Sequence, residues 1–143
     1  SDPELKQKLR IFDHVSIFYL IAGSYAPVCL ITLYNGIGLK IFISIIIITL
    51  VGTIFKVFYT GKYEKFSLAL YLAMGWIIVL DFKSILELFS LNAIILLVAS
   101  GLFYSLGTVF YSLQKIKYSH AIWHLFVLAG STSHYFLILL YVI

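Results

Sequence analysis

Five apolar stretches dominate this chain of 143 residues, and their length constrains its fold more than any other feature. Each stretch approaches the ~20 residues that an α-helix needs to cross a bilayer. Hydrophobic residues make up 62% of the chain and charged residues only 11%, against about 25% charged residues in soluble domains. Most of the surface therefore has to lie in lipid. The sequence predicts an all-α integral membrane protein, a helical bundle with five transmembrane helices.

The expected spans follow the apolar stretches in order. The first ten residues are polar and predict a short surface helix, which Ser1 or Asp2 can cap and whose Leu5 and Leu9 can face the membrane. Residues 83–91 are expected to form an interfacial turn of helix. We expect the five spans at residues 11–34, 39–59, 66–82, 92–113 and 118–143.

Local signals place a kink and a turn in the first half of the chain. Pro27 lies inside the first span, where proline clashes with the carbonyl of Gly23, so we expect a kink between these residues. The glycines of residues 35–38 predict a tight turn. The Ile/Phe run of residues 39–59 is typical of a lipid-facing helix, and Lys56 near its end can extend its ammonium group to the headgroups.

Small and hydroxyl side chains recur along one stripe of the span over residues 92–113. Small residues let membrane helices approach closely. This favours a helix-packing face over the alternative, which is a substrate path. The stripe consists of Gly101, Ser105, Thr108 and Ser112.

The basic residues lie near the ends of the spans and indicate an orientation. Eight of the ten Lys and Arg fall on one side, and only Lys40 and Lys83 fall on the other. The positive-inside rule then places the N-terminal end in the cytoplasm and the C-terminus outside, in the cytoplasmic (plasma) membrane. The net charge of +4 is therefore expected to serve lipid headgroups, with no nucleic-acid partner. Cys29 is the only cysteine, which excludes an intrachain disulfide.

Two histidines stand four residues apart where the last span enters the membrane. His120 and His124 project from the same helix face, and imidazole is the commonest protein metal ligand. Asp13 enters the first span at a similar depth on the same side, and ionisable groups inside membrane segments are costly and usually functional. We therefore predict a metal site of Asp13, His120 and His124, with zinc as the metal. The alternative for Asp13 is an interfacial ion pair with His14 or a loop lysine.

The other two histidines are expected to lie outside this site. His134 follows His120 by fourteen residues, or roughly 21 Å along a helix axis. It is expected to be a hydrogen-bonded interior side chain. His14 directly follows Asp13 and points about 100° away from it on a helix.

Motifs spread over nearly the whole chain resemble, in order, the bacterial hemolysin III family. That family belongs with the progestin and adipoQ receptors and, more distantly, with the alkaline ceramidases. The matching residues resemble its third-helix signature, its Gly-Trp helix and its last two helices. They are residues 13–17, 21–27, 71–76, 101–107, 110–111 and 120–130, followed by His134.

The resemblance implies a seven-helix protein with a zinc site on the cytoplasmic side. In that family the two last-helix histidines, here His120 and His124, bind the metal. The third-helix aspartate, here Asp13, holds the water at the metal or lies beside it. A further ligand comes from a Ser-x-x-x-His motif at the end of the second helix, which this chain does not contain. We therefore expect one hemolysin III-like domain over residues 1–143 that lacks the first two helices.

The missing motif also bears on the strength of the site. Structural zinc takes four protein ligands, and catalytic zinc usually takes three plus water. We expect the site to be one ligand short and the chain to bind zinc weakly. Restoring an upstream helix that ends in Ser-x-x-x-His is expected to tighten binding.

Three functions remain open on the sequence. The first is a zinc-dependent lipid-amide hydrolase with Asp13 as the catalytic base and a lipid or fatty-acid ligand. The second is a non-enzymatic membrane regulator or receptor in which zinc is structural. The third is a membrane-lytic, hemolytic protein, against which the chain lacks a strand series or a basic amphipathic helix. An enzyme should show a lipid-sized cavity open to the metal, whereas a structural site should be closed by four protein ligands.

Overall fold

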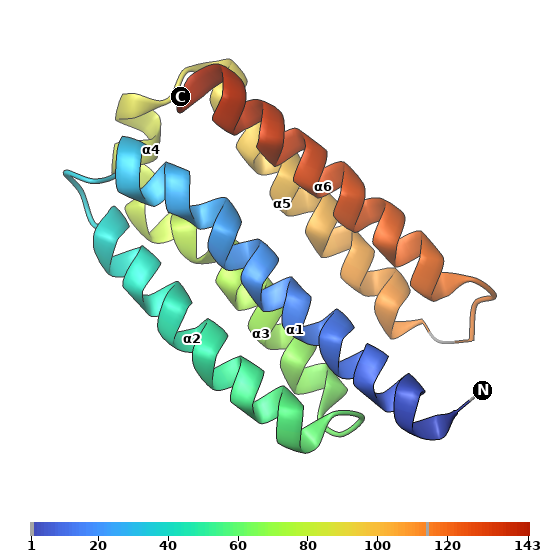
Figure 1. Cartoon of the computed structure of the whole chain (residues 1–143). Helices are drawn as coiled ribbons and strands as arrows, with labels where there is room; N and C mark the ends of the chain where they lie inside the picture. Colours follow the sequence, from blue (N-terminus) through green and yellow to red (C-terminus); the bar gives the residue numbers. More distant parts are fainter. Residues whose placement is uncertain (1, 114) are drawn as a thin grey trace.

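The computed structural model describes residues 2–113 and 115–143, and within them the chain forms a bundle of helices without strands. Five helical stretches are long and apolar enough to cross a membrane, as predicted. The two ends of the chain lie at opposite ends of the bundle (Figure 1). The helices are α1 (Pro3–Pro27), α2 (Gly38–Tyr59), α3 (Glu64–Trp76), α4 (Phe82–Leu88), α5 (Leu91–Ser112) and α6 (Ser119–Tyr141).

Helix α1 differs from the prediction at its start. The expected surface helix and the first span are one continuous helix, because no glycine or proline interrupts the chain between Pro3 and Gly23. Asp2 caps the helix, with its Oδ1 accepting from the N–H of Glu4 at 3.0 Å. Ser1, the other predicted cap, lies outside the described residues.

Two spans change helix type at the end of the bundle opposite the N-terminus. Directly after Pro27 the chain continues as a π-helix over Val28–Thr32. Pro27 therefore marks the change from α-helix to π-helix. It is also the last residue of the segment from Gly23 to Pro27 for which we predicted a kink. Helix α3 continues as a 3₁₀-helix over Ile77–Asp81 and then as α4, which is the predicted interfacial helix.

Hydrogen bonds between helices satisfy the backbone groups that these changes release. The hydroxyl of Tyr25 donates to the carbonyl of Gly75 at 2.8 Å and accepts from the N–H of Ile78 at 3.3 Å. The carbonyl of Ser24 is 2.8 Å from Nε2 of His134, which is 8% exposed. The prediction that His134 is a hydrogen-bonded interior side chain is therefore confirmed.

The predicted turn of residues 35–38 is present and is held by a buried carboxylate. Asp81 accepts from the N–H of Ile37 at 3.2 Å and from the hydroxyl of Ser84 at 2.7 Å. A Cβ on Gly36 would stand 2.6 Å from Oδ2 of Asp81, so the turn has no room for a side chain there. Asp81 thus ties the connection between α1 and α2 to the far end of the α3 span.

Helix α2 is lipid-facing on one side only, and the prediction for Lys56 is wrong. Lys56 is 0% exposed, and its Nζ lies 3.2 Å from both carboxylate oxygens of Glu64. The ammonium turns inward because the short connection after Tyr59 brings Glu64 within its reach. Gly52 lies on the same inner face, where a Cβ would overlap the ring of Phe18 on α1.

The small-residue stripe of α5 packs against α3, and the close contact with α6 lies elsewhere on α5. That contact is at Gly107, where a Cβ would lie 2.9 Å from the Cβ of Phe126. Gly101 and Ser105 instead face Trp76, whose Nε1 donates to the hydroxyl of Ser105 at 2.9 Å. The stripe residues Gly101, Ser105 and Thr108 line a cavity, and Ser112 is exposed. The prediction of a helix-packing face is therefore confirmed at Gly101 and Ser105 and wrong at Ser112.

Candidate metal centre

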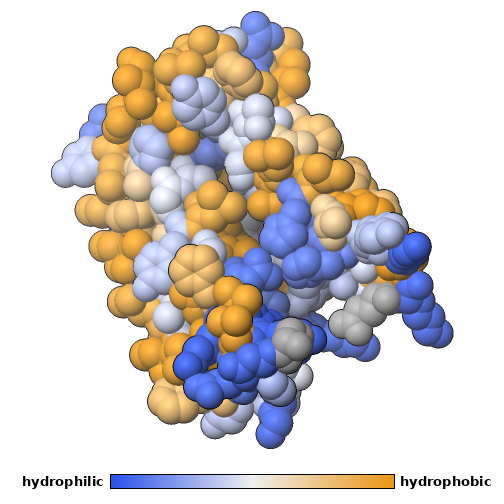
Figure 2. All heavy atoms as spheres, turned by 45° about the vertical axis from the view of Figure 1, so that its right-hand side comes forward, coloured by the Kyte–Doolittle hydropathy of each residue, from blue (hydrophilic) through white to orange (hydrophobic). Residues whose placement is uncertain are grey.

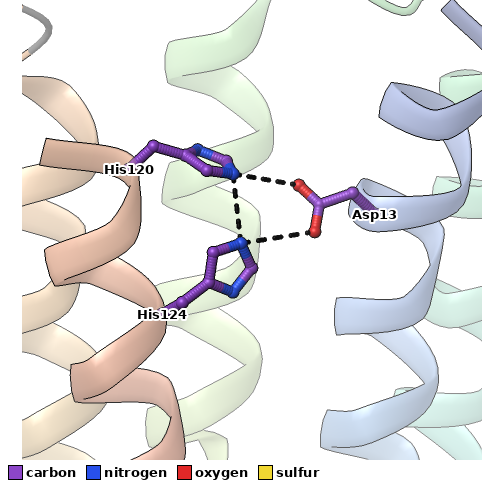
Figure 3. A group of neighbouring side chains, drawn as sticks. All are labelled: Asp13, His120 and His124. Atoms are coloured by element: carbon purple, nitrogen blue, oxygen red, sulfur yellow. Dashed lines mark hydrogen bonds and ion pairs between the residues drawn. The ribbon is translucent and has the colours of Figure 1, made fainter. Parts of the chain in front are cut away.

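Asp13, His120 and His124 come together between α1 and α6, as Figure 3 shows. The two Nε2 atoms are 3.0 Å apart. Nε2 of His120 lies 3.7 Å from Oδ2 of Asp13, and Nε2 of His124 lies 3.7 Å from Oδ1. The prediction that Asp13 lies near the histidine pair, across more than a hundred residues of chain, is therefore confirmed.

The short connection after α5 places the two histidines at the start of α6. The N–H of Ser119 bonds to the carbonyl of Ile116 at 3.1 Å, and Tyr118 takes the left-handed conformation with φ 64°. Helix α6 begins at once, so His120 and His124 occupy its first two turns. Both rings then face α1 at the level of Asp13 (Figure 3).

The donor set fits a zinc ion. Zinc binds imidazole nitrogen and carboxylate oxygen at about 2.0–2.2 Å, and a tetrahedron of that radius has edges of about 3.4 Å. The three ligand atoms lie within 4.8 Å of one another, with separations of 3.0 and 3.7 Å between the closest pairs. The two 3.7 Å distances run to different oxygens of Asp13, so small side-chain movements are needed before one of these oxygens and both rings share an ion.

The cluster is open rather than enclosed. The side chains of His120 and His124 are 60% and 47% exposed, and that of Asp13 is 30% exposed. Among the described residues, no fourth His, Cys, Asp or Glu joins the group. Positions around an ion held here are therefore free for water or another ligand.

His14 lies outside the cluster, as its position on the helix predicts. Its ring is buried at 2% exposure, and Nε2 lies 3.0 Å from the hydroxyl of Tyr111. The alternative pairing of Asp13 with His14 or a loop lysine is not seen in the described residues. The ion pairs of Asp13 there are with the rings of His120 and His124.

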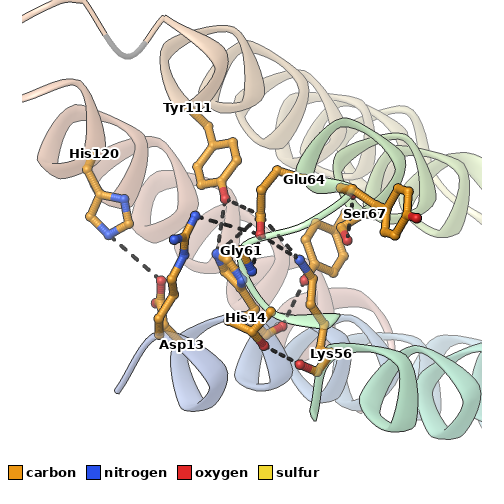
Figure 4. Close-up of polar contacts among 12 residues, drawn as sticks. Asp13, His14, Lys56, Gly61, Glu64, Ser67, Tyr111 and His120 are labelled. Atoms are coloured by element: carbon orange, nitrogen blue, oxygen red, sulfur yellow. Dashed lines mark hydrogen bonds and ion pairs between the residues drawn. The ribbon is translucent and has the colours of Figure 1, made fainter. Parts of the chain in front are cut away.

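A polar network beside the cluster was not predicted from the sequence (Figure 4). Glu64 is its centre, with an 18% exposed side chain that contacts three helices and its own turn. Besides Lys56, it accepts from the hydroxyl of Tyr111 at 2.9 Å and from the N–H of Gly61 at 3.1 Å, and Arg10 lies 3.7 Å away. The sequence feature that could have indicated this network is the pair of opposite charges, Lys56 and Glu64, which are eight residues apart with Gly61 between them.

An apolar cavity of about 280 Å³ runs through the bundle next to the cluster. Tyr111 and Trp123 line it at the end near the histidines, and Ile85 and Ile94 line it towards the other end. Tyr111 and Ile94 are seventeen residues apart on α5, or roughly 25 Å along the axis. The cavity thus has the length and the apolar lining that suit a lipid chain.

An open polar hollow lies at the same end of the bundle, and Tyr111 lines both it and the apolar cavity. Hydrophilic side chains gather at this end, whereas hydrophobic side chains cover much of the rest of the face in Figure 2. A ligand with a polar head and an apolar tail would therefore find both environments on either side of Tyr111. The hollow is lined by Leu9, Arg10, Asp13, His14, Tyr111, Ser119 and His120.

The five spans and the polar site at one end define a multi-pass helical membrane protein. The family model described as "Haemolysin-III related" matches residues 1–135, so the chain belongs to the haemolysin-III-related family. The resemblance seen in the sequence motifs is thereby confirmed.

Named relatives support the same assignment. The chain is 39% identical over 141 residues to "Hemolysin-3" of Bacillus cereus, covering 99% of this chain and 64% of the relative. It is 38% identical over 136 residues to "Hemolysin-3 homolog" of Bacillus subtilis (strain 168), covering 95% of this chain and 64% of the relative.

A more distant relative is the human "Monocyte to macrophage differentiation factor". The identity is 34% over 127 residues, which are 88% of this chain and 52% of the relative. The chain therefore spans just under two thirds of the length of its bacterial relatives and about half of the human one. No solved structure matches the chain.

Proposed function

We propose that this domain, residues 1–143, is a zinc-dependent hydrolase of lipid amides that works at the membrane surface. The observation that carries the proposal is an open cluster of three zinc-type ligands next to an apolar cavity. Catalytic zinc sites use three protein ligands and leave a position for water, whereas structural sites are closed by four. The exposed histidine rings favour the first arrangement.

The residues of the chain divide the work of an amide hydrolysis among them. Zinc bound by Asp13, His120 and His124 would supply a Lewis acid that polarises the amide carbonyl and activates water. The apolar cavity beyond Tyr111 would hold the acyl chain and fix the position of the carbonyl. As water adds to the carbonyl carbon and the C–N bond breaks, a carboxylate oxygen of Asp13 would take the water's proton and pass it to the leaving amine nitrogen.

The orientation proposed with this function is the one that the charges predict. The burial of Lys56 removes one lysine from the cytoplasmic-side surface, yet the basic residues on that side still outnumber those on the other. The centre would then face the cytoplasm from the plasma membrane, with membrane lipids as its partners.

Two other functions compete with the hydrolase. A regulator with structural zinc would need a fourth protein ligand, and the resemblance to the family places a further ligand on a helix upstream of residues 1–143, so the test below has to separate the regulator from the hydrolase. A lytic function has in its favour the printed name of the Bacillus cereus relative. No basic amphipathic surface helix separate from the spans is present among the described residues.

The test is zinc affinity and amide hydrolysis in the same purified protein. Detergent-solubilised protein is washed with chelator and loaded with excess zinc, and bound zinc is counted per chain by mass spectrometry. Release of fatty acid from an N-acyl sphingosine is then measured. His124→Ala should lose at least tenfold in zinc affinity and lose hydrolysis, because one of three ligands is gone. The control is His134→Gln, which changes a histidine of the same helix outside the cluster.

The outcomes separate the hypotheses. Unchanged zinc binding in His124→Ala would refute the metal centre. Zinc that binds through His124 without any release of fatty acid would refute the hydrolase and favour the regulator.

A further inference from the structure

The Tyr111 side chain touches residues next to all three metal-ligand candidates. Its hydroxyl lies 3.0 Å from Nε2 of His14, the residue next to Asp13 on α1. Its ring centroid lies 4.8 Å from that of Trp123, which stands between His120 and His124 on α6. The hydroxyl also reaches Glu64 on α3. Tyr111 therefore joins the two helices that carry the ligands to a third helix.

The directions of the hydrogen bonds at the hydroxyl can be assigned. A carboxylate only accepts, so the Tyr111 O–H donates to Oε2 of Glu64 at 2.9 Å. The phenol oxygen is then free to accept the N–H of His14 Nε2. Nδ1 of His14 is buried and finds no partner among the described residues, which agrees with the proton residing on Nε2. The chain of donors runs from His14 through Tyr111 to Glu64.

The acceptor at the end of this chain is fixed in place. Lys56 bonds both carboxylate oxygens of Glu64 from a fully buried position, and the N–H of Gly61 holds Oε1. Figure 4 shows these groups converging on the Glu64 carboxylate. Because Glu64 is held from two elements, the position of the Tyr111 hydroxyl is set by α2 and α3, independently of the metal ligands.

Contacts with other helices are needed to fix the position of α1 relative to α6, the two helices that supply the ligands. In the part of the chain that the structure describes, α1 and α6 have few close backbone approaches to each other, although each supplies ligands. The hydrogen bond of His134 to the carbonyl of Ser24 joins them eleven residues along α1 from Asp13, or roughly 16 Å away along the axis. Inside a bilayer, apolar burial does not drive helices together, so polar contacts and close packing decide their positions. The hydroxyl of Tyr71 adds a second restraint by donating to the carbonyl of His14 at 2.9 Å. Together these bonds fix the rotation of α1 that turns Asp13 towards α6.

We infer that the Tyr111 hydroxyl is a positioning group that holds Asp13 at the distance from His120 and His124 at which one metal ion is shared. This inference rests on the proposed metal centre and adds a residue that acts through His14 rather than on the ion. Groups behind metal ligands typically change metal affinity by 10–100-fold when they are removed. The loss of one hydroxyl is expected to lie at the lower end of that range.

The test uses Tyr111→Phe, which keeps the ring against Trp123 and removes only the hydroxyl. The matched control is Tyr104→Phe on the same helix. The hydroxyl of Tyr104 lies 2.9 Å from that of Ser131 on α6, and neither residue belongs to the cluster. Metal affinity is measured by chelator competition, and Co²⁺ is used as a probe because its absorption reports ligand geometry. Thermal unfolding of the metal-free proteins reports stability alone.

Tyr111→Phe should lose about tenfold in metal affinity and change the Co²⁺ absorption spectrum, while Tyr104→Phe keeps both wild-type values. If Tyr111→Phe lowers only the unfolding temperature, the hydroxyl is structural and the inference is refuted. If Tyr111→Phe binds Co²⁺ with wild-type affinity and spectrum, it is likewise refuted, and the metal centre itself stands. Absence of Co²⁺ and zinc binding in the wild-type protein would instead refute the metal centre.

Discussion

We predict that replacing Glu64 lowers the free energy of unfolding more than replacing Lys56, its buried partner. In Glu64→Leu the ammonium of Lys56 stays buried at 0% exposure and has no other acceptor among the described residues. Breaking a buried ion pair by removing one partner costs about 3–5 kcal/mol. We expect Glu64→Leu to destabilise the protein by an amount in this range.

The reverse change should cost less. In Lys56→Met the Glu64 carboxylate keeps Arg10 at 3.7 Å, the hydroxyl of Tyr111 and the N–H of Gly61. Because these groups still compensate the charge, we expect a cost of about 1.5–3 kcal/mol, the size of a lost hydrogen bond to a charged group. The double variant should be about 2 kcal/mol more stable than Glu64→Leu alone, because it contains no unpaired ammonium.

The assay is reversible unfolding in mixed detergent micelles with increasing dodecyl sulfate, followed by circular dichroism. A control pair exists at the other end of the bundle, where Lys83 and Glu87 stand 3.9 Å apart with side chains 87% and 62% exposed. Exposed pairs of this kind contribute little, so Lys83→Met should leave the unfolding curve unchanged. A double variant as unstable as the sum of its two single changes would refute the reasoning, because it would mean that Lys56 and Glu64 are not coupled.

Two further changes test the packing and the far end of the bundle. Gly107→Leu should destabilise the protein by about 1–3 kcal/mol because a Cβ at this position meets α6. Gly23→Leu is the control, since a Cβ there has no heavy atom within 4 Å. Equal unfolding curves for the two variants would contradict the contact at Gly107. Asp81→Ala should cost about 1–3 kcal/mol because the N–H of Ile37 loses its charged, buried acceptor. The exposed Glu87→Ala serves as its control. Both effects are measured by the same unfolding assay, and an Asp81→Ala curve that matches that of Glu87→Ala would show that the carboxylate does not hold the turn.

The sequence predicts the spans and the metal cluster because both depend on regular geometry. Apolar length gives the number of helices, and a spacing of four places His120 and His124 on one face. Asp13 is more than a hundred residues away, yet the chain crosses the membrane four times between the two entry points, and an even number of crossings returns it to the same side. The common membrane depth of Asp13 and the two histidines therefore makes this long-range contact predictable. The sequence of a soluble protein offers no such guide.

What the sequence did not reveal depends on which way individual side chains turn. Lys56 could reach the headgroups or turn inward, and only the position of Glu64 across the hairpin decides between them. Gly101 and Gly107 are equally small, and both lie on α5. Because six residues rotate a helix by about 240°, they face different neighbours, and the register of α5 against α6 determines which of them makes the close contact.

Two features that the sequence did not decide shape the surroundings of Asp13, His120 and His124. The stripe residues Gly101, Ser105 and Thr108 leave room for the apolar cavity because their side chains are short. The inward turn of Lys56 fixes Glu64, and through Tyr111 it restrains the helix that carries Asp13. A bundle with the same ligands but with leucines on the stripe and an outward lysine could still bind metal. It would lack both the apolar cavity beside the ligands and the hydrogen bonds that join α1 to α3 and α5.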